Sequence, residues 1–152
     1  MIIRKATKQD LSRIAEIFVF NNRINYFPIF NQEDFSFGTL QVVSMIDHYF
    51  GKEEIMGTLF VAEDSGIVKG FMEIRETEIG KLYVDPCFQS SGIGDKLIEY
   101  AVQNLHTDFL WVLEKNTRAR AFYRRHGFTE SGEKEYEEGT TEYLLKLIRK
   151  RK

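Results

Sequence analysis

The stretch VDPCFQSSGIGDKL, residues 84–97, constrains the fold most strongly, because a strand-like run gives way there to a helix-like run. Polar residues and two glycines, Gly92 and Gly94, lie between the two runs. The first N–H groups of a helix have no partner inside it, and its N-terminus carries roughly +0.5 of an elementary charge. Glycines allow an anion to approach such a backbone closely. The stretch therefore predicts either a cradle for a phosphate or pyrophosphate group or a tight turn whose glycines serve only the bend.

Strand-like and helix-like segments alternate along the whole chain. Apolar residues at helical spacing or in short runs mark each segment, and Thr7 and Asp10 form a cap-like pair before the first helix. Strands are expected at 1–6, 57–66, 67–76, 78–85 and 108–115, with a final hairpin within 128–150, and helices at about 11–18, 40–50, 93–105 and 116–127. This alternation predicts an α/β fold, a sheet with helices on both faces. With 152 residues, the chain is expected to form one domain, 1–152.

Charge and cysteine content exclude several classes of function. The 21 lysines and arginines against 23 aspartates and glutamates give a net charge of −2, which does not favour nucleic acid as a partner. Cys87 is the only cysteine, which excludes a disulfide framework or a cysteine-rich zinc site within one chain, and no metal is expected. No apolar run approaches the ~18 residues of a membrane span, and the first residues lack the apolar core of a signal peptide. These features indicate a cytoplasmic protein, and the basic run 149–152 is expected to be a solvated terminus.

Two motifs together resemble the GCN5-related N-acetyltransferase (GNAT) family. Residues 89–94, QSSGIG, match the family's Gln/Arg-x-x-Gly-x-Gly/Ala pattern, and residues 116–128, NTRARAFYRRHGF, resemble its second motif. The motifs stand in the family's order, about one helix and one strand apart, and the start IIRKATKQDLSRIAEIF resembles the family's usual beginning. The resemblance covers nearly the whole chain and is weakest over residues 20–56. It implies a mixed, mostly antiparallel, splayed sheet flanked by helices.

The resemblance implies acetyl-CoA as the acyl-donating co-substrate. In the family, main-chain groups of the strand before the glycine turn pair with the pantetheine arm. N–H groups at the start of the following helix hold the pyrophosphate, and the second motif contacts the arm. The residues implied are Leu82, Tyr83, Val84, Gln89, Ser90, Ser91, Gly92, Ile93, Gly94, Asp95, Asn116, Ala119 and Tyr123. Taken alone, Asn116 is also explained as a helix N-cap.

The resemblance also implies that Tyr123 lies near the thioester sulfur. A phenol, with an ordinary pKa of ~10, can donate a proton to the departing CoA thiolate as a general acid. Alternatively, Tyr123 is a core aromatic beside Phe122. The resemblance further implies a base for the acceptor amine among the carboxylates near the strand that precedes the glycine turn. Glu76 and Glu78 share one face if the strand extends that far, and are otherwise solvated charges at the strand end; Glu73 is a third candidate.

An aromatic run without clear periodicity is the most prominent feature outside the motifs. It contains Tyr26, Phe27, Phe30, Phe35 and Phe37. Such a run predicts either an apolar acceptor site, with the first three residues as candidate substrate contacts, or a core or homodimer contact.

The resemblance therefore implies an acetyl-CoA-dependent N-acetyltransferase in which an acceptor amine attacks the thioester directly, without a covalent enzyme intermediate. A small-molecule amine is favoured as acceptor, because no acidic or basic groove is evident in the sequence. The alternatives are an acetyltransferase that acts on protein N-termini or lysines, a non-catalytic CoA-binding module, and an α/β protein that binds another phosphorylated ligand.

Overall fold

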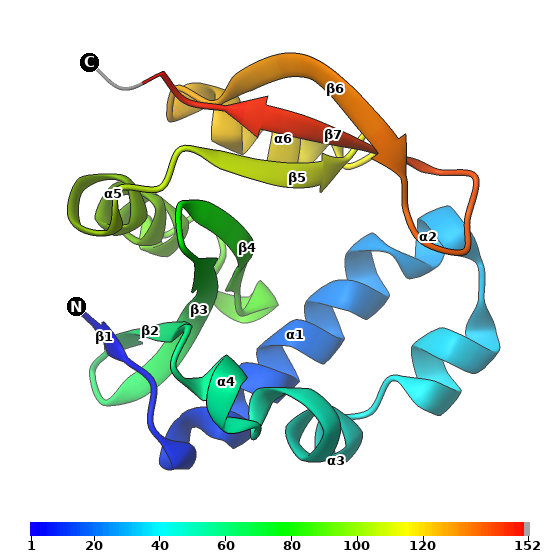
Figure 1. Cartoon of the computed structure of the whole chain (residues 1–152). Coiled ribbons are helices and arrows are strands. Elements are labelled where there is room, and N and C mark those ends of the chain that lie inside the picture. Colours follow the sequence, from blue (N-terminus) through cyan, green and yellow to red (C-terminus); the bar gives the residue numbers. More distant parts are fainter. Residues whose placement is uncertain (151–152) are drawn as a thin grey trace.

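The computed structural model describes residues 1–150 and shows one seven-stranded sheet with helices on both of its faces (Figure 1). Residues 151 and 152, which end the predicted domain and its basic terminus, lie outside the described part. The strands are β1 (Ile2–Lys5), β2 (Leu59–Asp64), β3 (Ile67–Arg75), β4 (Glu78–Val84), β5 (Phe109–Leu113), β6 (Thr129–Tyr136) and β7 (Tyr143–Ile148). Their order is β1-β2-β3-β4-β5-β7-β6, and all neighbours are antiparallel except β4 and β5. The predicted mixed, mostly antiparallel sheet is confirmed.

Helices are present at each of the four positions where the apolar periodicity predicts them, and two further short helices, at 27–30 and 53–56, are not predicted from the sequence. The helices are α1 (Leu11–Asn25), α2 (Phe27–Phe30), α3 (Val42–Met45), α4 (Glu53–Met56), α5 (Ile93–Leu105) and α6 (Thr117–Arg125), with short turns η1 (Lys8–Asp10), η2 (Asp34–Thr39), η3 (Ile46–Phe50) and η4 (Pro86–Phe88). The helix expected at about 40–50 is α3 continued by η3. The N–H of Thr7 donates to Asp10 Oδ2 at 2.7 Å, which confirms the cap-like pair. None of the described helices is both long and apolar enough to cross a membrane.

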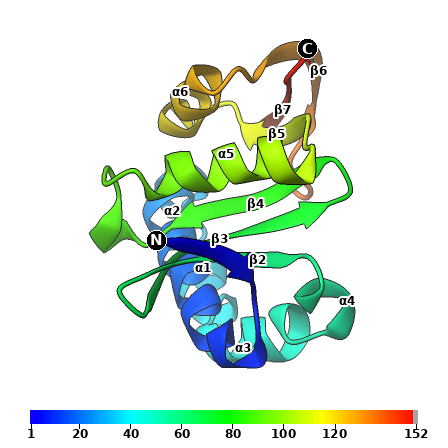
Figure 2. The same cartoon turned by 90° about the vertical axis from the view of Figure 1, so that its left-hand side faces the viewer.

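Two apolar cores, one on each face of the sheet, hold these helices in place. Alternate residues of β2 serve different cores: Phe60 and Ala62 pack with α5, whereas Leu59 and Val61 pack with α1. Figure 2 shows α5 and α1 on opposite sides of the sheet. The residues of α5 and α1 that these cores bury are Ile93, Leu97, Ile98 and Ala101 from α5, and Ile14, Ala15, Ile17, Phe18 and Val19 from α1. The expectation of helices on both faces is therefore confirmed.

The sheet opens between β4 and β5. These two strands pair at only two positions, Glu78 with Phe109 and Ile79 with Leu110. On its other edge β4 stays paired with β3 as far as Val84. β5 in turn pairs with β7 along its whole length. From Gly80 onward, the β4 edge that faces β5 therefore has no strand partner, and the predicted splay is present.

A fully buried carboxylate ties β3 and β4 to η3. The Glu73 side chain is 0% exposed, and the Tyr49 hydroxyl donates to its Oε1 at 2.5 Å. Arg75 Nη1 lies 3.2 Å and Lys81 Nζ 3.5 Å from Glu73 Oε2. A buried carboxylate is tolerated only when it is paired and hydrogen-bonded. Glu73 therefore holds three elements together, and this role replaces the one expected for it as a third candidate base.

We expect Glu73→Gln to lower the free energy of unfolding by about 3 kcal/mol, because breaking a buried pair leaves its cations without a counter-charge. Glu133→Gln is the control, since Glu133 forms an ion pair with Lys146 while its own side chain is 63% exposed. Exposed ion pairs contribute about 1 kcal/mol or less. Urea unfolding followed by circular dichroism measures both variants. Equal effects of the two substitutions would contradict a structural role for Glu73.

Candidate active site

A cavity of about 1200 Å³ lies where β4 and β5 separate. Its walls come from α1, α2, β4, the glycine turn, the end of β5, α6 and the connection between β6 and β7. The cavity thus runs from the start of α5 to the β6–β7 connection, between strands that no longer pair. Segments far apart in the sequence meet there because both sides of the splay contribute to its lining.

Most of the residues predicted to bind the co-substrate line this cavity. They are Leu82, Tyr83, Val84, Gln89, Ser90, Gly92, Gly94, Asp95, Asn116, Ala119 and Tyr123. Two of the predicted residues do not line it. Ile93 is 5% exposed and belongs to the apolar core around α5, and the exposed Ser91 donates its hydroxyl to the carbonyl of Phe88. Side-chain contacts from Ser91 and Ile93 are therefore not supported, whereas contacts through their main-chain N–H groups stay a prediction.

The two glycines of the turn are needed for different reasons. Gly92 caps α5 with φ +89°, and a Cβ built there would meet nothing within 4 Å. Its requirement is conformational, because left-handed backbone disfavours a side chain. A Cβ on Gly94 would lie 3.3 Å from the Phe122 ring, so this glycine allows α5 to pack closely against α6. Neither sequence interpretation of the glycines, as a phosphate cradle or as a tight turn, includes this packing role of Gly94.

Polar side chains anchor the turn to α1. Asn21, 2% exposed, donates its amide to the carbonyl of Val84 at 2.9 Å. Gln89 Nε2 lies 3.2 Å from Asn21 Oδ1 and 3.3 Å from the same carbonyl. Asp85 accepts from Arg13 Nη2 at 2.9 Å and from the N–H of Cys87 at 2.8 Å. Gln89 therefore positions the turn, a role that its place in the motif does not reveal.

Three tyrosines line the cavity, Tyr26, Tyr83 and Tyr123. The hydroxyls of Tyr26 and Tyr83 lie 3.2 Å apart. Tyr123 is 9% exposed, and its hydroxyl has no hydrogen-bond partner among residues 1–150. Burial, with a smaller contribution from Tyr26, raises the pKa of Tyr123 above that of an ordinary phenol. The phenol therefore stays protonated near neutral pH and can donate its proton to a group in the cavity.

Asn116 caps α6. Its Oδ1 accepts from the N–H of Ala119 at 3.1 Å, as its alternative reading as an N-cap predicts. The same residue also lines the cavity, so a cap and a contact with a bound molecule are compatible. The contact itself stays a prediction.

The structure separates the two carboxylates considered as a base. Glu78 begins β4, lines the cavity and forms an ion pair with Arg75, with Arg75 Nε 3.5 Å from Glu78 Oε1. Glu76 lies in the turn between β3 and β4 with φ +56° and does not line the cavity. The strand does not extend to Glu76, so the condition under which the two carboxylates would share one strand face is not met. Glu78 remains as the candidate.

The aromatic run divides between the cavity and its surroundings. Tyr26, Phe30 and Phe35 line the cavity. Phe27 does not, because its ring packs edge-to-face against Phe37 at 5.1 Å between centroids. The expectation of Phe27 as a substrate contact is thus not supported, whereas that for Tyr26 and Phe30 agrees with their positions. A homodimer contact stays a prediction.

Sequence reasoning missed several polar residues of the lining. Lys81 and Arg75 lie on the central strands, and Glu135, Glu137 and Glu138 lie on or just after β6. The sequence feature that could have indicated the three glutamates is the run GEKEYEEG, whose first three glutamates recur at every second residue. Without knowing which strands lie across the splay, this run reads as a solvated hairpin.

Comparison with known proteins places the chain among the acyltransferases. The model of the acetyltransferase (GNAT) domain matches residues 56–130. An uncharacterized N-acetyltransferase of Archaeoglobus fulgidus is 30% identical over 138 residues, which cover 81% of this chain and 89% of that protein. The chain belongs to the GNAT acetyltransferase family.

Two further relatives extend the comparison. A peptidyl-lysine N-acetyltransferase, YjaB of Salmonella typhimurium, is 35% identical over 80 residues, which span 52% of this chain and about half, 55%, of that protein. A 5-NmdU N-acetyltransferase of Pseudomonas phage PaMx11 is 38% identical over 85 residues, covering 51% of this chain and 61% of that protein.

Solved structures share the fold over nearly the full length. The apo form of YjaB from Escherichia coli has a TM-score of 0.70 at 22% identity and covers 97% of both chains. PaiA N-acetyltransferase from Thermoplasma acidophilum, in complex with coenzyme A, has a TM-score of 0.69 at 20% identity and covers 97% of this chain and 98% of that one.

We expect Gly94→Val to lower the free energy of unfolding by about 1–3 kcal/mol through overpacking against Phe122. In a Phe122→Ala background, most of this penalty should disappear. Gly92→Ala should cost about 1–2 kcal/mol because of its left-handed backbone, with no relief from Phe122→Ala. A double-mutant cycle by urea unfolding measures both couplings. An equal response of the two glycines to Phe122→Ala would contradict their separate roles.

Proposed function

We propose that the protein is an acetyl-CoA-dependent N-acetyltransferase that acts on a small-molecule amine. The observation that carries this proposal is the coincidence of two features in one cavity. The unpaired edge of β4 and the N-terminus of α5 both lie on the wall of the same space of about 1200 Å³. An extended amide chain that ends in a pyrophosphate fits both features, because one offers a strand edge and the other an anion site.

The residues present fit such a molecule in detail. The carbonyl of Val84 already accepts from Asn21, so the residues before it, from Gly80 to Leu82, would supply the main-chain pairing with the pantetheine arm. The first N–H groups of α5 would hold the pyrophosphate. Arg118 and Arg125 of α6 line the same cavity and offer positive charge. When bound, the co-substrate supplies the activated acetyl group as a thioester.

The transfer needs one proton donor and one proton acceptor on the protein. The nitrogen of the neutral amine forms a bond to the acetyl carbon, and the C–S bond breaks with its electron pair remaining on sulfur. Tyr123, with its raised pKa, donates its hydroxyl proton to that sulfur. Glu78, directly or through water, accepts the proton that the nitrogen loses. Proton exchange with solvent then returns both side chains to their starting states.

The acceptor is the least constrained part of this proposal. The relatives named above include one that acts on peptidyl-lysine and one named for 5-NmdU, so the acceptor varies among them. Tyr26, Phe30 and Phe35 form an aromatic wall of the cavity, which supports a small amine as the acceptor because its apolar part could pack against these rings. Acetylation of protein lysines or N-termini is the alternative for the acceptor, and a CoA-binding module without turnover is the alternative for the activity.

Calorimetric titration with acetyl-CoA tests the binding part. We expect wild type to bind in the micromolar range and Gly92→Trp to show no binding, because the indole would occupy the anion site. The matched control is Gly66→Trp, since Gly66 also has positive φ (+79°) and open space around its Cβ position but lies in the turn between β2 and β3. Absence of binding by wild type, or loss of binding in the control, would overturn the assignment.

Replacement of Tyr123 by phenylalanine tests the chemical part. We expect kcat for acetyl transfer to a primary amine to fall about 10²–10⁴-fold, because the thiolate loses its proton donor, while acetyl-CoA affinity stays within a factor of about two. Release of the CoA thiol measures the rate. Tyr100→Phe is the control, because Tyr100 packs against Phe60 outside the cavity. An unchanged kcat in Tyr123→Phe would exclude the general-acid role.

A further inference from the structure

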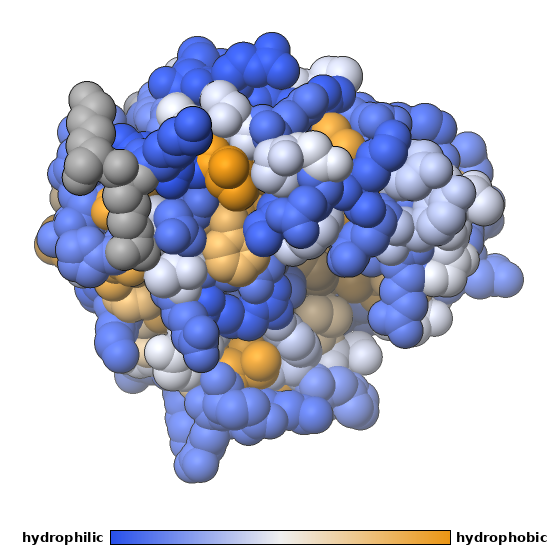
Figure 3. All heavy atoms as spheres, turned by 45° about the horizontal axis from the view of Figure 1, so that its top comes forward, coloured by the Kyte–Doolittle hydropathy of each residue, from blue (hydrophilic) through white to orange (hydrophobic). Residues whose placement is uncertain are grey.

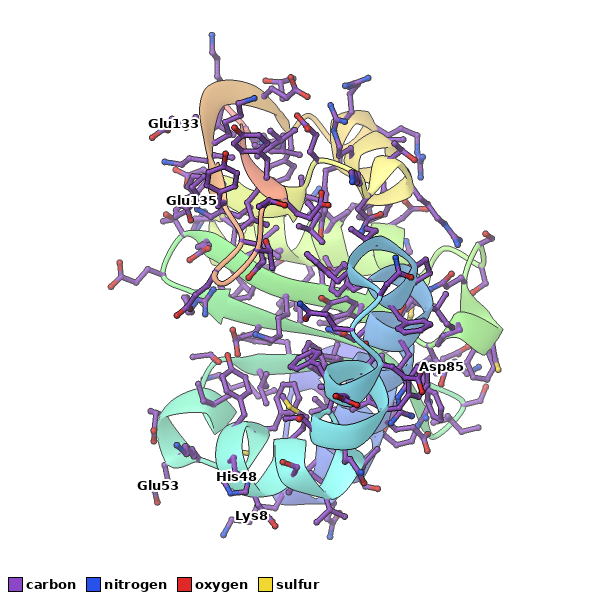
Figure 4. The ribbon with its side chains drawn as sticks, turned by 90° about the vertical axis from the view of Figure 1, so that its right-hand side faces the viewer. Lys8, His48, Glu53, Asp85, Glu133 and Glu135 are labelled. Carbon is purple, nitrogen blue, oxygen red and sulfur yellow. The ribbon has the colours of Figure 1, made fainter. Side chains whose placement is uncertain are left out.

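Three carboxylates beside the β6–β7 connection form an acidic wall of the cavity. Glu135 lies in β6 opposite Leu144 of β7, Glu137 and Glu138 follow the strand, and all four residues line the cavity. Figure 4 shows Glu133 and Glu135 on this hairpin, and the outer face that it shares with α6 is mostly hydrophilic (Figure 3). We call Glu135, Glu137 and Glu138 the hairpin carboxylates.

The hairpin carboxylates have no cationic partner among residues 1–150. Other carboxylates of the same hairpin do: Glu133 pairs with Lys146, and Glu142 pairs with Lys115. No lysine, arginine or histidine in the described chain lies within ion-pair distance of the hairpin carboxylates. They therefore contribute three negative charges that no described side chain neutralises at close range.

The cations on the central strands are already neutralised. Arg75 lies 3.2 Å from Glu73 Oε2 and 3.5 Å from Glu78 Oε1, and Lys81 Nζ lies 3.5 Å from Glu73 Oε2. Two cations thus face two carboxylates in one network. The uncompensated negative charge beside the β6–β7 connection would therefore attract a cation that enters the cavity.

Glu137 is the best placed of the three. Its N–H donates to the carbonyl of Glu142 at 2.8 Å, and its own carbonyl accepts from Thr140 N and Oγ1 at 3.0 and 2.8 Å, so the turn holds its backbone. Burial raises the pKa of Glu137, as expected for a half-buried carboxylate without a counter-ion. Its charge also adds to the effect of burial in raising the pKa of both Tyr26 and Tyr83. Glu137 therefore lies close enough to Tyr26 and Tyr83 to interact with them electrostatically.

A second feature of the cavity also offers a polar group to a bound molecule. Tyr123 is 9% exposed and lines the cavity, yet its hydroxyl has no partner in the described chain. Among the described residues, this hydroxyl is not one of the fully buried side-chain atoms that lack a partner, so it is open to the cavity and available to bond to a bound molecule. Burial raises the pKa of Tyr123, and an electrostatic interaction with Tyr26 adds to this effect. Tyr123 and Tyr26 therefore lie close enough to interact.

The chemistry distinguishes which nitrogen the carboxylates would bind. The nucleophile must be a neutral amine, whereas carboxylates stabilise the charged ammonium form and raise its pKa. Three of them would therefore hold the reacting nitrogen in its unreactive state. The hairpin carboxylates suit a second, non-reacting nitrogen that stays protonated throughout. The rings of Tyr26, Phe30 and Phe35, which also line the cavity, would contact the alkyl chain between the two nitrogens.

We propose that Glu137, supported by Glu135 and Glu138, binds the non-reacting ammonium of the acceptor, so that the acceptor is a linear aliphatic diamine or polyamine. This inference rests on the proposed N-acetyltransferase function. It makes Glu137 a specificity-determining residue, because a matched acceptor without the second charge leaves the carboxylate unpaired in a partly desolvated site.

The test compares α,ω-diamines of three to six carbons with amino alcohols of the same lengths, each with acetyl-CoA. We expect wild type to favour the best diamine over its amino alcohol by about 10–100-fold in kcat/KM, the range for one hydrogen bond to a charged group. Glu137→Gln should reduce this ratio to within about threefold of unity. Glu133→Gln, on the same hairpin but outside the cavity lining, should keep the wild-type ratio.

The outcomes separate this inference from the proposed function. If acetyl-CoA does not bind in the calorimetric titration, the proposed function fails and the inference fails with it. If acetyl-CoA binds but wild type acetylates no diamine, or treats diamine and amino alcohol alike, only the inference is overturned. A preference for a lysine-containing peptide over every diamine, or a ratio unchanged in Glu137→Gln, overturns it as well. Acetyl-CoA affinity in Glu137→Gln within twofold of wild type confirms that the variant is folded.

Discussion

The loss of pairing between β4 and β5 after Ile79 is the constraint on which the rest of the structure depends. Each of these strands keeps a full partner on its other edge, β3 for β4 and β7 for β5, so the sheet stays stable while its centre opens. The N–H and C=O groups on the β4 edge that faces β5 have no strand partner and can pair with another molecule. The open edge therefore favours any molecule that brings amide groups to it, and the cavity follows from the strand pairing itself.

The apolar pattern was sufficient to predict the fold, but it could not predict the contacts across the splay. Periodicity and turn residues indicated every strand and the main helices, and the two motifs indicated the glycine turn and α6. Glu76 and Glu78 differ by two positions in sequence, yet only the observed end of β3 at Arg75 places one in a turn and the other in a strand. The buried network around Glu73 joins η3 to two strands, and no local pattern encodes such a long-range contact.

Motif residues can also serve the fold and the site at once. Gly94 matches the family pattern, but its observed neighbour is the Phe122 ring of the second motif, so the two motifs contact each other directly. Gln89 holds the turn to Asn21, and Asn116 caps α6. The spacing of the motifs thus reflects how α5 packs on α6 as well as any co-substrate contact.

Local charge, and not the net charge of −2, decides what this cavity can attract. No acidic groove is evident in the sequence, because lysine and tyrosine separate the first three glutamates of GEKEYEEG. In the hairpin, residues two apart share a face, so Glu135 and Glu137 line the cavity, whereas Lys134 lies over the ring of Tyr143. The N-terminus of α5 favours an anion and the hairpin carboxylates favour a cation. An anionic donor would therefore be attracted to the N-terminus of α5, and a cationic acceptor to the hairpin carboxylates. Tyr123 lies on the wall of the same cavity.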